Sequence, residues 1–68
     1  MITEIGIAAG DIWHCLDERG SATLDQLAKR IGKPKELLLM SLGWLAREGH
    51  VTLGGSESGY LASLTPNR

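Results

Sequence analysis

The chain has 68 residues, of which 43% are hydrophobic and 22% are charged, and its formal net charge is -1. This length allows one domain with a single-layer core, and the composition is too apolar for a disordered segment. The charge balance argues against strong unaided binding of nucleic acid, because domains that hold phosphate backbones usually carry an excess of Lys and Arg.

The cysteine content and the first residues favour a cytoplasmic protein. Cys15 is the only cysteine, so it cannot form an internal disulfide, and this fits a reducing compartment. No basic segment precedes the first apolar stretch, which Glu4 and Asp11 interrupt. The sequence therefore predicts neither a signal peptide nor a membrane span. It indicates no cofactor, metal or small-molecule substrate.

A first helix is predicted from Thr3 to about Arg19, where apolar residues recur at spacings of three and four. We expect its inward face to consist of Ile5, Ala8, Ala9, Ile12, Trp13 and Leu16. Gly20 suits the positive φ that often follows a helix. Gly6 and Gly10 each weaken the helix by about 1 kcal/mol relative to alanine. Either the first turns fray or another backbone comes close, and the sequence leaves both open.

A short second helix is predicted after residues 21–23, which are suited to an edge strand. Thr23 is the expected N-cap, and Gln26 at the third helical position completes a capping box. The inward stripe consists of Leu24, Leu27, Ala28 and Ile31. Gly32 is expected to end this helix, and Pro34 to begin the next after a tight turn.

A third helix is predicted from Pro34 to Glu48, with Gly49 as its C-cap. We expect its inward arc to consist of Leu37, Leu38, Ser41, Leu42, Trp44 and Leu45. Both tryptophans of the chain are thus expected to anchor the core rather than to stack on bases. The outward arc consists of Lys35, Glu36, Leu39, Met40, Gly43, Ala46 and Arg47. A helix of a small domain normally shows water a polar face, so these large apolar side chains indicate a covering segment or a partner.

The rest of the chain is predicted to form a β-hairpin, because apolar residues now alternate with polar ones. The expected inward positions are Val51, Leu53, Tyr60, Ala62 and Leu64. Glycine-rich residues 54–59 are expected to form a flexible hairpin loop. The predicted fold class is α+β and mostly helical, in a single domain over residues 1–68.

Three motifs carry a resemblance to a known family. They are GDIWHCLDERG at 10–20, TLDQLAKRIG at 23–32 and LGWLAREGHV at 42–51. With the order of the elements, they resemble the small uncharacterised prokaryotic winged helix-turn-helix proteins. The resemblance implies three helices, a short first strand and a C-terminal β-hairpin wing. It also implies that the third helix enters a DNA major groove while the wing contacts backbone or minor groove.

The resemblance assigns these DNA contacts by position to the wing at 54–59 and to Lys33, Lys35, Glu36, Leu39, Met40, Gly43 and Arg47. The chain departs from a typical DNA reader at two points. Its wing carries Glu57 and no Lys or Arg, and its third helix has no Asn or Gln to recognise adenine.

The leading hypothesis is a winged helix-turn-helix transcriptional regulator that binds double-stranded DNA weakly or only as a dimer. Its candidate DNA contacts are Lys29, Arg30, Lys33, Lys35 and Arg47. The alternative for these residues is a solvated basic rim that only keeps the domain soluble. Affinity from so few cations should fall steeply with salt.

The competing hypothesis is a protein-interaction or self-association module that binds no nucleic acid. A homodimer or another protein would then bury the candidate interface of Leu39, Met40, Gly43 and Ala46, with Ile7 nearby. The alternative is that the wing or the N-terminal segment of the same chain covers these positions.

An enzyme is not expected, because a domain of this size has little room for a pocket. His14 and Cys15 are neighbours in a helix and therefore point about 100° apart, which suits a nucleophile and its base poorly. We expect a surface histidine and a cysteine at the edge of the core. His50 is expected to be a polar turn residue, and a third metal ligand cannot be placed.

Overall fold

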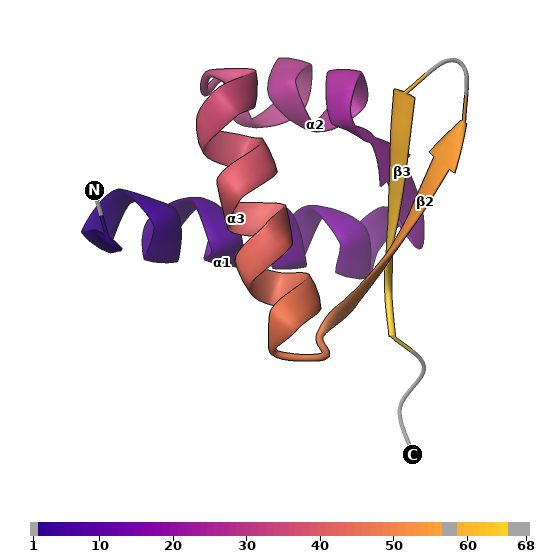
Figure 1. Ribbon diagram of the computed structural model, residues 1–68. Helices are drawn as coiled ribbons and strands as arrows, with labels where there is room; N and C mark the ends of the chain where they lie inside the picture. The colour runs from indigo at the N-terminus through magenta and orange to yellow at the C-terminus, as the bar shows by residue number, and fades with distance from the viewer. Residues whose placement is uncertain (1, 57–58, 66–68) are drawn as a thin grey trace.

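The computed structural model describes residues 2–56 and 59–65, and in these it has three helices and a three-stranded sheet in the predicted order (Figure 1). The elements are α1 (Ile2–Arg19), β1 (Ser21–Thr23), α2 (Leu24–Ile31), α3 (Lys35–Arg47), β2 (Val51–Ser56) and β3 (Gly59–Leu64). The α+β, mostly helical winged helix-turn-helix architecture is confirmed. No helix in the described residues is long and apolar enough to cross a membrane.

The sheet places the short first strand at its edge, as the sequence predicts. The strand order is β1-β3-β2, and both neighbouring pairs are antiparallel. Ala22 of β1 lies opposite Ala62 of β3, and Val51 of β2 lies opposite Leu64. Ala22, Ala62 and Val51 are buried, so one face of the sheet closes the core behind the helices.

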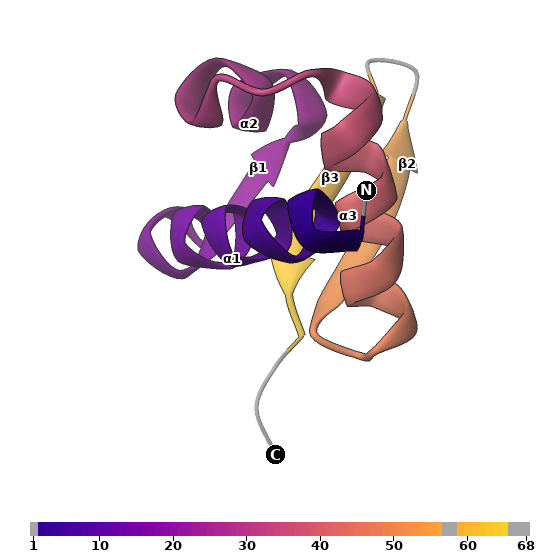
Figure 2. The same cartoon turned by 90° about the vertical axis from the view of Figure 1, so that its left-hand side faces the viewer.

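The core forms where α3 crosses α1, with α2 packed against α3 at one end (Figures 1 and 2). The buried side chains of the helices are Ala8, Ala9, Ile12, Cys15, Leu16, Leu27, Leu38, Ser41, Leu42 and Leu45. Leu38 and Leu42 are fully buried, whereas Met40 on the opposite side of α3 is 44% exposed. The predicted orientation of α3 is confirmed, and it decides which side chains a ligand can meet.

The start of α2 is held by the predicted capping box. The Thr23 hydroxyl accepts a hydrogen bond from the Gln26 backbone N–H at 3.2 Å, and the Thr23 N–H donates to Gln26 Oε1 at 2.9 Å. At the other end, Gly32 adopts φ 77° and donates its N–H to the Ala28 carbonyl. This left-handed residue ends the helix without the steric cost of a side chain, so α2 and α3 meet across a short turn.

Both tryptophans were wrongly assigned to the core. Trp13 is 40% exposed and Trp44 is 49% exposed. The reason is angular. By steps of 100°, Trp13 lies about 100° around α1 from fully buried Ile12, and Trp44 lies about 160° around α3 from fully buried Leu42. The predicted inward faces of the two helices were therefore too wide, and the two tryptophans lie at the edges of the buried faces.

Cys15 and the hairpin also differ from expectation. Cys15 is only 5% exposed, in the core rather than at its edge, because α1 is also covered from the side of α2 and the sheet. Strand pairing continues through Gly54 and Gly55 to Ser56 opposite Gly59, so the predicted loop over 54–59 is too long. Its residues 57–58 lie outside the described part of the chain.

Two expected inward positions of the hairpin are exposed. Leu53 lies opposite Ala62 and therefore on the same face of the sheet, but it is 37% exposed, and Tyr60 is 48% exposed. The helices cover this face at Val51 and Ala62 and do not extend over these two residues. The ends of α3 differ from the prediction by one residue: Pro34 is the N-cap and Glu48 the C-cap, followed by Gly49 with φ 81°.

Candidate nucleic-acid interface

Four of the five candidate DNA-binding cations lie at one end of the helix-turn-helix. Lys29 and Arg30 are in the last turn of α2, Lys33 is in the turn, and Lys35 is the first residue of α3. Arg47 is in the last turn of α3. At 1.5 Å per residue it stands about 18 Å along the helix from Lys35. The fold therefore gathers four cations around the turn and leaves the fifth at the far end of α3.

Three of these cations are paired with carboxylates. Arg30 donates to Glu18 at 2.7 Å and Lys33 donates to Asp11 at 3.1 Å, and both pairs join the helix-turn-helix to α1. Lys35 pairs with Asp25. Its hydrogen bond and its charge lower the pKa of that carboxyl group below the ordinary value.

These ion pairs reduce the positive field around the turn. Their side chains are between 31% and 67% exposed, and exposed pairs usually contribute only about 0 to 1 kcal/mol. A phosphate group can therefore replace such a carboxylate at small cost. Lys29 and Arg47 are exposed and form no ion pair within residues 2–56 and 59–65.

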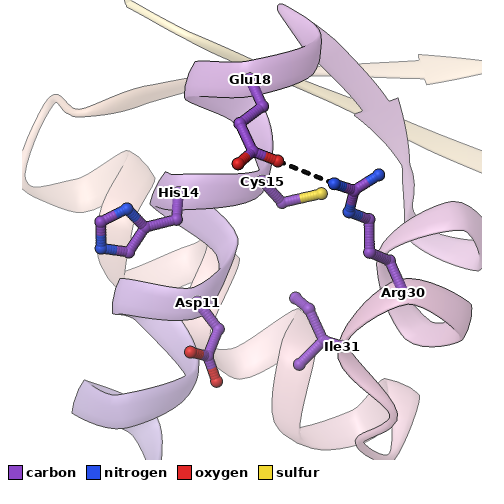
Figure 3. Close-up of a pocket in the computed structure, with 6 residues that line it drawn as sticks. All are labelled: Asp11, His14, Cys15, Glu18, Arg30 and Ile31. Atoms are coloured by element: carbon purple, nitrogen blue, oxygen red, sulfur yellow. Dashed lines mark hydrogen bonds and ion pairs between the residues drawn. The ribbon is translucent and has the colours of Figure 1, made fainter.

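A cleft of about 290 Å³ lies between α1 and α2 beside these pairs. It is lined by Asp11, His14, Cys15, Glu18, Arg30 and Ile31 (Figure 3). Figure 3 shows the Arg30 guanidinium reaching across to Glu18, while the His14 ring and the Cys15 thiol point in different directions. In the part of the chain that the structure describes, no group of three His, Cys, Asp or Glu residues is placed to hold a metal ion.

The candidate protein interface on α3 is largely open. Leu39 is 40% exposed, Met40 is 44% exposed and Gly43 is also exposed. Ala46 is half-buried and packs against the core. Ile7 is 56% exposed but belongs to α1, about 140° around that helix from buried Ile12. It therefore faces away from the core.

A second apolar surface, which the sequence did not reveal, lies between α1 and α3. One cleft of about 350 Å³ is lined by Ile2, Ile5, Gly6 and Trp44. A neighbouring cleft of about 280 Å³ is lined by Gly6, Ala9, Gly10, Trp13, Trp44, Leu45 and His50. The available signal was the spacing of Ile2, Gly6, Gly10 and Trp13, which share one flank of a helix. This surface was missed because Trp13 was assigned to the core.

Comparison with known proteins places the chain among domains of this architecture. The model of a family described as a winged helix-turn-helix domain (DUF2582) matches residues 1–63. The chain is also similar to protein BT2368 from Bacteroides thetaiotaomicron, whose structure was determined in solution by NMR. That likeness has 27% sequence identity and a TM-score of 0.79, and it covers 91% of this chain and 76% of BT2368. No curated protein sequence matches the chain.

Proposed function

The chain belongs to the winged helix-turn-helix domain (DUF2582) family, and from its geometry we propose that it is a transcriptional regulator that binds double-stranded DNA weakly or as a dimer. The observation that carries this proposal is the open outer face of α3, which has Lys35 near one end and Arg47 near the other. In winged helices this helix enters the major groove. The proposal assigns the domain no catalytic role.

The outer face of α3 is shaped for close approach to bases. Gly43 lies midway along it, and a Cβ placed there would meet nothing within 4 Å. The helix backbone can therefore come close to the groove floor. Arg47 can donate to guanine, and the apolar Leu39 and Met40 suit contact with thymine methyl groups.

The electrostatics favour a low affinity that depends on salt. If Lys29, Arg30, Lys33 and Lys35 each neutralise one phosphate, the four contacts give a slope of about -3.6 in log K against log salt. Affinity then falls about 100-fold between about 50 mM and about 200 mM salt. Three of these contacts also displace a carboxylate. A dimer would double the number of phosphate contacts.

The proposal is tested by fluorescence anisotropy of labelled duplex DNA with two matched variants. Arg47→Ala removes a cation from the outer face of α3, whereas Arg19→Ala removes an exposed cation from the end of α1. Loss of a base-contacting arginine costs about 1 to 3 kcal/mol. We therefore expect Arg47→Ala to weaken binding at least fivefold and Arg19→Ala to change it less than twofold. Equal effects of both variants would contradict the proposed orientation.

A second candidate function is protein interaction through the outer face of α3. The exposure of Leu39 and Met40 favours it, since adjacent large apolar side chains on an open helix face are typical of a protein contact. The Leu39→Ser/Met40→Ser variant tests it by gel filtration. If the apparent size of the wild type rises with concentration and that of the variant does not, this face is the interface.

A further inference from the structure

The surface between α1 and α3 is apolar and open. We call it the α1–α3 groove and define it by Ile2, Gly6, Gly10 and Trp13 of α1 and Trp44 of α3. Figure 2 shows the N-terminal turns of α1 toward the viewer with α3 beside them. Ile2 is 86% exposed, and His50 is the only titratable side chain of the described residues that lines the two clefts. No Asp, Glu, Lys or Arg in that part of the chain lines them to favour an ionic ligand.

The two glycines of the groove have no function within the chain that the structure reveals. A Cβ at Gly6 or Gly10 would meet nothing within 4 Å, so no neighbouring backbone in the described residues requires glycine there. Each still weakens α1 by about 1 kcal/mol relative to alanine. Four residues apart, they leave a bare strip of helix backbone that faces outward and allows a second helix to approach closely.

We propose that the occupant of the α1–α3 groove is a second copy of this chain, whose α1 helix packs antiparallel on the first. A two-fold axis between Gly6 and Gly10 would place each Gly6 against Gly10 of the other copy. The same axis would place each Ile2 beside Trp13 of the other copy, because the facing positions then sum to about 16. The protruding Ile2 of each copy would then enter the cleft beside Trp13 of the other copy. The same surface is used by both copies, as an isologous interface requires.

The available area fits a small homodimer. Trp13 and Trp44 expose 40% and 49% of their surfaces and Ile2 exposes 86%. With the glycine strip, the apolar area is on the order of 450 Å² per copy. A polar rim would bring it to roughly 600 Å², which is at the low end of specific interfaces. We therefore expect a dissociation constant on the order of 10 µM.

Dimerisation through the α1–α3 groove uses a flank of α3 that adjoins its DNA-facing side. Trp44 lies about 100° around α3 from Gly43 but only about 40° from Met40 and about 60° from Arg47, so the groove and the DNA-facing side share an edge. The proposal does not rest on DNA binding. The dimer formed through this groove could be the one that binds DNA, if the protein binds DNA as a dimer.

Sedimentation equilibrium tests the dimer directly over about 1 to about 500 µM protein. We expect the wild-type mass to rise from monomer to dimer with a midpoint near the dissociation constant. Tryptophan emission should move to shorter wavelength over the same range, because both tryptophans lie in the groove. Gly10→Lys should raise the dissociation constant at least 30-fold, so that at about 50 µM it is mainly monomeric while the wild type is mainly dimeric. The variant should stay folded, because lysine forms helix better than glycine.

Two further variants distinguish the α1–α3 groove from association through another surface of the domain. Ile7→Lys adds the same charge on a side of α1 outside the groove, so we expect it to dimerise as the wild type does. Trp13→Ser removes a half-exposed groove side chain, and we expect it to weaken the dimer about tenfold even if Gly10→Lys fails to fold. A wild type that stays monomeric throughout would overturn the proposal. So would a dimer that survives both Gly10→Lys and Trp13→Ser, or one that only Leu39→Ser/Met40→Ser disrupts.

Discussion

The ion pairs between α1 and the helix-turn-helix should limit the affinity for DNA. In the variant Asp11→Asn/Glu18→Gln, Lys33 and Arg30 lose their carboxylate partners. The control Asp17→Asn/Glu48→Gln changes the net charge by the same amount at two exposed carboxylates that form no ion pair within residues 2–56 and 59–65. The difference between the two variants therefore isolates the ion pairs from the overall charge.

The magnitude follows from the exposure of the pairs. Their side chains are between 31% and 65% exposed, so each pair contributes about 0.5 kcal/mol. The variant Asp11→Asn/Glu18→Gln does not have to break these two ion pairs before it contacts phosphates. It should therefore bind DNA about fivefold more tightly than the control variant. The assay is fluorescence anisotropy with one labelled duplex at low salt, after circular dichroism has shown that both variants are folded. Equal affinities would refute the view that these carboxylates compete with DNA.

Three further predictions concern stability, each measured by urea unfolding. Leu42→Ala should lower the free energy of unfolding by about 2 to 5 kcal/mol because Leu42 is fully buried, whereas Met40→Ala should lower it by less than about 1 kcal/mol; similar losses would mean that α3 is turned differently. Thr23→Ala should cost about 1 kcal/mol through loss of the N-cap, and a neutral effect would argue against the capping box. Lys35 lowers the pKa of Asp25 in the folded state, so this pair stabilises the fold above the ordinary aspartate pKa of about 3.9 and loses its effect as the pH falls through the lowered value. The stability difference between wild type and Asp25→Asn should therefore shrink below about pH 4, and a constant difference would exclude the pair as its cause.

The sequence specified the order of elements well because each boundary has its own local chemistry. Thr23 and Gln26 satisfy the first N–H groups of α2, and Gly32 takes a left-handed conformation that only glycine adopts cheaply. The inward direction of Leu38 and Leu42 followed from helical spacing alone. These features depend on residues close in the chain, so one sequence is enough to find them.

The flanks of the helices could not be predicted in the same way. Trp13 and Trp44 lie near the boundary between buried and exposed, and the crossing of α1 and α3 decides on which side each falls. That crossing is a tertiary property, as is the cover that buries Cys15. The pairing of Arg30 with Glu18, 12 residues away, and of Lys33 with Asp11, 22 residues away, likewise required the packed helices. The candidate cations were visible in the sequence, but their neutralisation was not.

The most direct test of the account is a titration of the protein with duplex DNA, followed residue by residue through its amide NMR signals at about 50 mM and about 200 mM salt. We predict that shifts at the lower salt concentration are confined to residues 29–47 and include Lys33, Lys35 and Arg47. Binding should be about 100-fold weaker at the higher concentration. If the signals of these three residues do not move at about 50 mM salt, the outer face of α3 does not bind DNA and the proposed function is wrong.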